Sequence, residues 1–203
     1  MERSVRWDGP PLEAWAPWRP EEIARRLAGT RAHWCVVGGF ALDLFLGRET
    51  RKHEDLEISV PRPELELVRR RLAGFVFHSV GDGVRALAPG EEPPPDKHQN
   101  WVLDPAANAW RVDVMLEPGD ADTWVFRRDE SIRAPRSFMV TTSAGGVPFL
   151  VPQGVLLFKA KGTRPKDEAD FAAVLPELDA AARAWLGASL ARAHPQHPWR
   201  ERL

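Results

Sequence analysis

The segment at residues 37–60, VGGFALDLFLGRETRKHEDLEISV, constrains the fold of this chain more than any other stretch. An apolar run over 33–37 predicts a buried strand, and the two glycines after it break that strand. Apolar spacing over 40–46 predicts a short helix that Gly47 ends, and 55–60 predicts a second strand that stops at Pro61. The local order is therefore strand, turn, helix, polar connector and strand.

Short strands dominate the middle of the chain, and helices dominate its end. Proline and acidic residues early, with arginine late, predict helices at 20–28 and 63–72. The sequence TSAGG at 142–146 predicts the turn of a hairpin. Because the pattern becomes helical near residue 152, we expect a main domain at 1–152 and a helical region at 153–203. The other predicted strands span 75–80, 85–87, 100–103, 110–116, 138–141 and 147–150, and the later helices span 155–161, 166–175 and 180–193.

The charge balance argues against a protein whose main task is to neutralise nucleic-acid phosphates. The chain of 203 residues has 28 basic and 29 acidic side chains, a net charge of −1 and a pI near 6.6. Hydrophobic residues make up 43% and charged residues 28%, which is typical of a folded globular protein. We therefore expect a folded chain whose main task is not nucleic-acid binding.

Cysteine usage and the absence of long apolar runs indicate a cytoplasmic protein. Cys35 is the single cysteine, so an intramolecular disulfide is excluded, and its place in the apolar run HWCVV predicts a core residue. The N-terminus shows no apolar segment of a signal peptide, and no run of about 18 apolar residues occurs. We expect a soluble protein that is neither exported by a signal peptide nor embedded in a membrane.

Two acids lie two residues apart in the second predicted strand. Side chains at this spacing point to the same face, so Asp55 and Glu57 would project together about 6–7 Å apart. Carboxylates this close repel each other unless a cation lies between them, which makes them natural ligands of Mg²⁺. A third acid, Asp113 in WRVDVML, would complete the cluster from a neighbouring strand. Three acids suit two metal ions and an in-line phosphoryl or nucleotidyl transfer.

Groups suited to phosphate precede the acids. Gly38 and Gly39 follow a strand and precede a helix, where glycine lets the backbone approach a phosphate. Arg48, Arg51 and Lys52 in the connector would add positive charge. Taken alone, a glycine pair is usually only a turn, and an acid pair is usually a solvated strand edge.

In this order and spacing the residues resemble a known family, the DNA polymerase β-like nucleotidyltransferases. The resemblance is to the small antibiotic nucleotidyltransferases, similar to aminoglycoside 2''-adenylyltransferase and the lincosamide nucleotidyltransferases. It rests on GGFALDLFLGRETRKHEDLEI at 38–58 and continues at Asp113, at LLFKAKGTRPKDEADF over 156–171, and more faintly at the C-terminal HPWRERL. Glu57 stands where many relatives have aspartate, and Phe40 where tryptophan is frequent.

The resemblance implies an α+β polymerase β-like nucleotidyltransferase fold, a mixed sheet flanked by helices with a short C-terminal helical region. It implies two Mg²⁺ ions on Asp55, Glu57 and Asp113, with Asp113 also the candidate general base. It further implies ATP or another NTP as co-substrate, and a homodimer is compatible with it. The residues predicted to contact the nucleotide are Gly38, Gly39, Arg48, Arg51, His53 and Lys161.

Several of these residues also have structural interpretations. His53 either orients Asp55, contacts phosphate or is structural, and Lys161 reaches a phosphate or is a solvated lysine. For Asp43 we expect an ion pair with Arg48 or Arg51. Helix-cap and ion-pair roles are expected for Arg164, Lys166, Asp167 and Asp170, and a packing role for Trp7, Trp15 and Trp18.

The leading functional hypothesis is a Mg²⁺-dependent nucleotidyltransferase that moves AMP from ATP to a hydroxyl of a small molecule. An aminoglycoside- or lincosamide-like antibiotic is the favoured acceptor. One alternative keeps the chemistry but targets tRNA or protein, as in toxin-like relatives. Another is a nucleotide-binding module without catalysis.

Overall fold

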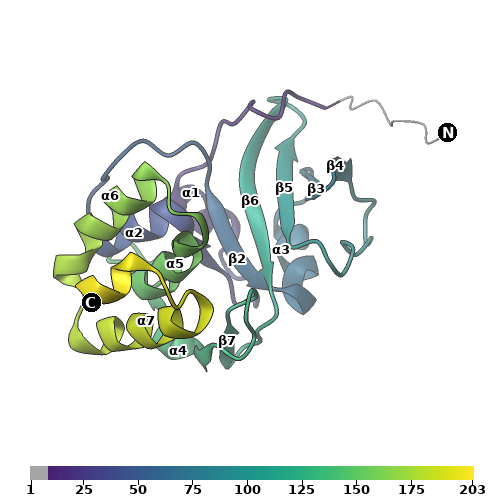
Figure 1. Ribbon diagram of the computed structural model, residues 1–203. Coiled ribbons are helices and arrows are strands. Elements are labelled where there is room, and N and C mark those ends of the chain that lie inside the picture. The colour runs from purple at the N-terminus through teal and green to yellow at the C-terminus, as the bar shows by residue number, and fades with distance from the viewer. Residues whose placement is uncertain (1–8) are drawn as a thin grey trace.

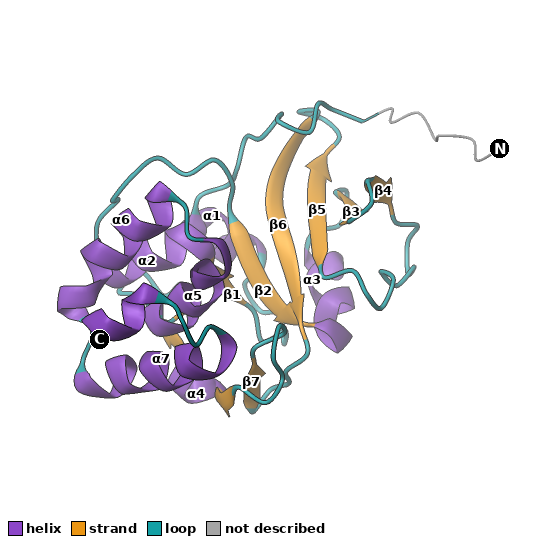
Figure 2. Ribbon diagram, in the orientation of Figure 1, coloured by secondary structure: helices purple, strands orange, loops and turns teal. Residues whose placement is uncertain are grey.

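A mixed sheet of eight strands runs through the computed structural model, which describes residues 9–203 (Figures 1 and 2). The strand order is β4-β3-β5-β6-β2-β1-β10-β9, in which β2–β6 and β1–β10 are parallel and the other neighbours antiparallel. Two further strands, β7 (Thr123–Val125) and β8 (Arg133–Pro135), form a separate hairpin. The sheet strands are β1 (Cys35–Val37), β2 (Glu57–Pro61), β3 (Val76–Val80), β4 (Val84–Ala86), β5 (Gln99–Asp104), β6 (Ala109–Glu117), β9 (Val140–Thr142) and β10 (Pro148–Leu150).

The helices gather mainly on one side of β2. Figures 1 and 2 show α2, α5, α6 and α7 together there, while β5 and β6 extend on the other side. Helix α5 packs against both α2 and α7, so the C-terminal helices are in contact with the helix that follows β1. The helices are α1 (Pro20–Arg26), α2 (Gly38–Leu46), α3 (Leu65–Arg71), α4 (Arg136–Met139), α5 (Pro152–Lys159), α6 (Pro165–Val174) and α7 (Ala180–Ala193). Short 3-10 turns lie at Arg62–Glu64, Ala160–Gly162, Leu175–Glu177 and Pro198–Arg202.

The predicted strand–helix–strand unit is present as β1–α2–β2, with shifted boundaries. Helix α2 already begins at Gly38, so the glycine pair is its first turn and not a separate loop. Strand β2 begins at Glu57, which leaves Asp55 in the segment before it. The two acids therefore do not share one regular strand.

The predicted strand at 138–141 is partly wrong, because α4 occupies Arg136–Met139 and β9 starts only at Val140. Arg136 and Met139 are both buried, and their spacing of three residues matches one helical turn. A single turn is too short for periodicity to distinguish it from a strand. The strands β7 and β8, three residues each, were not predicted for the same reason.

Aromatic side chains fill much of the core. Cys35 is fully buried, as predicted. Trp18 is buried edge-on against Phe75, and Trp15 packs against Trp110, so both have the expected packing role. Trp7 lies outside the described residues. No helix among residues 9–203 is long and apolar enough to cross a membrane.

Candidate active site

Two of the predicted acids are direct neighbours in the sheet. Glu57 in β2 pairs with Asp113 in β6, and the Asp113 amide donates to the Leu56 carbonyl at 2.8 Å. The strands are parallel and in register here, so the two carboxylates project from the same face. Asp113 is 1% exposed. Asp55 precedes Glu57 by two residues, and its charge acts on both other acids.

The electrostatics of this pair are unfavourable without a cation. Burial, followed by the charge of Asp55, raises the pKa of Glu57 to about 7, although Lys159 and nearby basic groups oppose the shift. Burial and the charge of Glu57 raise the pKa of Asp113 well above its ordinary value. Buried acids that repel each other favour protonation or a bound cation.

One oxygen of Asp113 lacks a partner. The Gln99 side-chain amide donates to Asp113 Oδ2, whereas Oδ1 is buried and accepts no hydrogen bond. The Trp101 indole faces Asp113 across β5–β6 and opposes the rise in the pKa of Asp113. Within residues 9–203 no three His, Cys, Asp or Glu side chains meet in a geometry ready to hold a metal ion. The orphaned oxygen and the all-carboxylate donor set nevertheless suit Mg²⁺ chemically.

Gly38 and Gly39 leave room for functional side chains. Gly38 has φ +65°, and a Cβ there would overlap Glu57 Oε2. A Cβ on Gly39 would collide with the His53 ring. The glycine pair therefore allows Glu57 and His53 to lie directly against the start of α2.

Asp43 organises the connector differently from the sequence-based expectation. No ion pair joins it to Arg48 or Arg51 in the described chain, so that prediction is wrong. Instead Asp43 Oδ1 accepts from the Thr50 amide at 3.0 Å and the Thr50 hydroxyl at 2.6 Å, and Oδ2 lies 2.5 Å from His53 Nε2. The His53 side chain is only 3% exposed, so it is placed to brace the connector.

A network of ion pairs ties the connector to the C-terminal helices. Arg51 binds both oxygens of Asp170 at 3.1 and 3.2 Å. Lys159 bridges Asp170 at 2.9 Å and Asp167 at 2.8 Å, and Arg164 pairs with Asp167 at 2.8 Å. These contacts confirm the cap and ion-pair roles expected of Arg164, Asp167 and Asp170.

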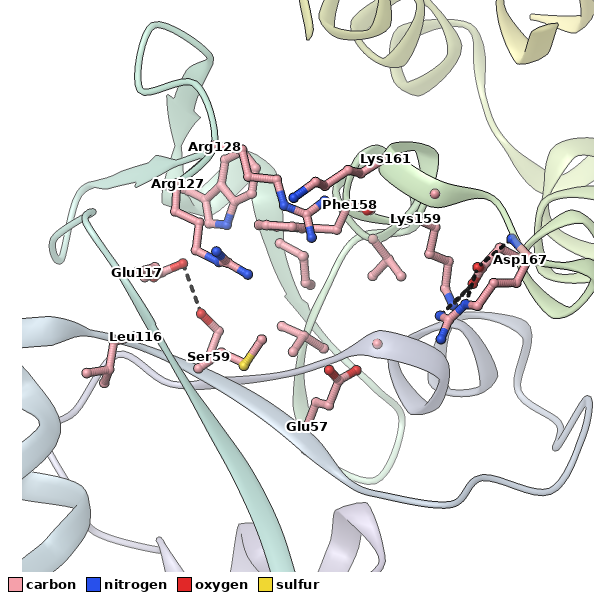
Figure 3. A pocket seen from close by; sticks show the side chains of 18 residues that line it. Glu57, Ser59, Leu116, Glu117, Arg127, Arg128, Phe158, Lys159, Lys161 and Asp167 are labelled. Atoms are coloured by element: carbon pink, nitrogen blue, oxygen red, sulfur yellow. Dashed lines mark hydrogen bonds and ion pairs between the residues drawn. The ribbon is translucent and has the colours of Figure 1, made fainter. Parts of the chain in front are cut away.

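A pocket of about 460 Å³ opens beside Glu57, between the sheet and α5 (Figure 3). Of the residues predicted to contact the nucleotide, Gly38 and Lys161 line this pocket, whereas Gly39, Arg48, Arg51 and His53 do not. The lining residues are Val37, Gly38, Glu57, Ser59, Met115, Leu116, Glu117, Trp124, Arg127, Arg128, Leu150, Val155, Phe158, Lys159, Lys161, Gly162, Arg164 and Asp167.

Sequence reasoning missed the two arginines of this pocket. Arg127 and Arg128 lie just after β7, in FRRDE, and their guanidinium carbons lie 5.8 and 5.2 Å from the centre of the Phe158 ring. Burial lowers the pKa of Arg127, while the charges of Asp113 and Glu57 oppose that shift. Arg127 thus lies within electrostatic reach of acids more than ten residues away in sequence. An arginine pair in a loop carries no recognisable motif.

A buried ion pair lies at another side of the pocket. The Arg136 guanidinium donates to Glu117, which also accepts from the Ser59 hydroxyl at 3.1 Å. Burial raises the pKa of Glu117, although Arg136 opposes that shift. Because Glu117 is already paired, Glu57 is the lining acid without a basic partner in the described structure.

The fold is similar to that of two solved structures of ANT(2'')-Ia, and the predicted mixed sheet flanked by helices is confirmed. The solution structure of the antibiotic-resistance factor ANT(2'')-Ia matches 90% of this chain and 97% of its own, with a TM-score of 0.51 and 16% identity. The crystal structure of ANT(2'')-Ia in complex with adenylyl-2''-tobramycin matches 84% of this chain and 94% of its own, with a TM-score of 0.55 and 16% identity.

The narrower resemblance is carried by the first half of the chain. The family described as aminoglycoside-2''-adenylyltransferase matches residues 21–89. Two proteins named 2''-aminoglycoside nucleotidyltransferase, from Escherichia coli and Klebsiella pneumoniae, are 35% identical to this chain over 89 residues. These alignments cover 42% of this chain and 44% of each relative, so the chain matches less than half their length. The resemblance to this enzyme family is confirmed, and the family match includes Asp55 and Glu57 but not Asp113.

Proposed function

We propose that this protein is a nucleotidyltransferase that transfers the nucleoside monophosphate of an NTP to a hydroxyl of a small molecule. One observation carries the proposal: Glu57 lines a pocket whose other side is basic, and it stands in register with Asp113 of the neighbouring strand. A nucleotide with Mg²⁺ requires acidic residues that attract the cation and, on the opposite side, basic residues that attract the phosphates. The resemblance to aminoglycoside nucleotidyltransferases supports the same chemistry.

Glu57 and Asp113, with Asp55 beside them, are the residues that would hold Mg²⁺. When bound, Mg²⁺ would neutralise phosphate charge and lower the pKa of the attacking hydroxyl. Asp113 would orient the acceptor hydroxyl and take up its proton. The hydroxyl oxygen then bonds to the α-phosphorus as the bond from that phosphorus to the pyrophosphate oxygen breaks.

ATP and an aminoglycoside are the co-substrate and acceptor that we propose first. The matched relatives are named for aminoglycosides, and one similar structure holds adenylylated tobramycin. A lincosamide-like acceptor would need the same chemistry. A shared cleft in a homodimer stays a prediction.

The test is pyrophosphate release with each NTP and Mg²⁺ across aminoglycosides, lincosamides and buffer, with product mass measured in parallel. We expect one acceptor to gain the mass of one nucleotide, and Asp113→Asn to lower turnover by at least about 100-fold because it loses both a ligand and a base. Asp113→Asn, once shown to be folded, is also the control that separates transfer by this site from background reaction. If no acceptor gains mass while nucleotide still binds, the small-molecule proposal fails in favour of a macromolecular target or a binding module.

A further inference from the structure

Three basic side chains form one side of the pocket, and we call them the basic wall: Arg127, Arg128 and Lys161. Figure 3 shows them across the pocket from Glu57. The two arginines follow β7, and Lys161 lies in the 3-10 turn after α5. Segments more than 30 residues apart in sequence therefore place positive charge on one surface.

The basic wall has no acidic partner in the part of the chain that the structure describes. Among the other charged lining residues, Lys159 and Arg164 pair with Asp167, and Glu117 pairs with Arg136. Neither Arg127 nor Lys161 makes a hydrogen bond or ion pair within residues 9–203. Arg127 is half-buried, whereas Arg128 and Lys161 are exposed. A half-buried cation without an acidic partner favours an anion on this side of the pocket.

The arginines of the basic wall are held in place by aromatic packing. Arg128 Nη1 donates to the Phe158 carbonyl at 2.7 Å, and both guanidiniums lie over the Phe158 ring. Phe158 in turn packs edge-on against Phe126 at 4.8 Å and Trp124 at 6.2 Å. These contacts restrict the side chains before a ligand arrives, while the N–H donors of Arg127 remain available.

We propose that the basic wall binds the phosphate chain of the nucleotide and that Arg127 makes the main contact. The inference rests on the proposed function, because it assigns the pocket to an NTP. Arginine matches phosphate with two parallel hydrogen bonds, and the Glu57 carboxylate on the other side repels phosphate in the absence of a cation. The phosphates therefore lie between Arg127 and Glu57, and the orientation of the nucleotide follows from the two opposed charges.

Isothermal titration calorimetry of the full chain with Mg²⁺ tests this assignment without an acceptor. The ligands are inorganic tripolyphosphate, ATP and adenosine, and the variants are Arg127→Gln, Arg127→Lys and, as a control, Arg25→Gln. Arg25 is an exposed residue of α1. We expect Arg127→Gln to weaken tripolyphosphate and ATP by about tenfold or more and to leave adenosine unchanged. Arg127→Lys, which keeps the charge but loses the paired donors, should fall between.

The inference is overturned if folded Arg127→Gln or Arg127→Lys binds ATP and tripolyphosphate as wild type does. It is also overturned if the wild type binds neither ligand, or if Arg25→Gln loses as much affinity as Arg127→Gln. Failure of the proposed function gives a different result: ATP binds and depends on Arg127, yet no acceptor gains mass. If the protein transfers nucleotide but the Arg127 variants bind ATP as wild type does, the proposed function stands and the assignment of the basic wall to phosphate binding is rejected.

Discussion

The contact between Gly38 and Glu57 is the detail on which the site geometry most depends. Glu57 lies where any side chain at Gly38 would be, and Gly38 also has a left-handed backbone at φ +65°. Glycine meets both demands, because it has no Cβ and tolerates positive φ. The carboxylate position is therefore set by a residue that carries no functional group.

Gly38→Ala should damage both stability and activity, and Gly47→Ala is its matched control. Gly47 has φ +66° but nothing within 4 Å of an added Cβ. Both variants should lose about 1–2 kcal/mol of unfolding free energy from backbone strain. Gly38→Ala should lose more and also reduce pyrophosphate release by about 100-fold, because Glu57 must move. Urea titrations and turnover measure this, and equal turnover of the two variants would refute the role of the contact.

At the scale of elements, the ion pairs around α6 join parts that the sequence separates. Arg51 in the connector and Lys159 at the end of α5 meet on Asp170 of α6. Burial alone would raise the pKa of Asp170, but hydrogen bonds from Arg51 and Lys159 outweigh it and lower the pKa below 3.8. A lowered pKa in the folded state means that the ionised carboxylate stabilises the fold.

This stabilisation should depend on pH in a defined direction. It is fully present above the unfolded pKa of Asp170, about 3.9, and is lost as the pH falls through the lower folded pKa. Asp170→Asn should therefore cost about 3 kcal/mol at pH 7, because Arg51 loses its carboxylate partner and Lys159 keeps only Asp167, and less below about pH 4. Urea titrations at several pH values measure the difference. Asp82→Asn, at an exposed pair with Lys97, should show little effect, and a pH-independent cost for Asp170→Asn would contradict the linkage.

At the scale of the whole molecule, the C-terminal segment closes the helical layer. Trp199 is fully buried and stacks on Phe171 of α6 at 4.3 Å, and its indole N–H donates to Glu168 at 2.9 Å. The HPWRERL segment thereby acquires a packing role. Because α5 packs against α2, the helices after residue 152 share a core with the sheet domain, and the boundary between 1–152 and 153–203 remains a prediction.

Trp199→Ala should cost about 3–5 kcal/mol by removing a buried indole, whereas Trp199→Phe should cost less because it keeps the stacking. We expect one cooperative urea transition for both variants, measured by circular dichroism and fluorescence. Two separated transitions would instead show that 153–203 unfolds independently. A stability equal to wild type for Trp199→Ala would refute the packing role.

Much of the fold could be predicted because its signals are local. Helix α7 coincides with its predicted range, and the strand–helix–strand unit differs only at its ends. Elements of three or four residues, such as β7, β8 and α4, were missed or misassigned because they span less than two periods of either pattern. Boundaries near Gly38 moved because tertiary contacts decided where the helix begins.

The sequence by itself determined the order of the elements and the kinds of side chain near the site, including Asp55, Glu57 and Asp113. Periodicity and residue chemistry depend on near neighbours, which sequence contains. Only the tertiary structure decided which side chains meet: that Asp43 holds Thr50 and His53, and that Arg127 lies near the acids. Those contacts depend on long-range packing. Many cations could pair with each carboxylate, and the partner is the one that lies nearest in space, whatever its distance in sequence.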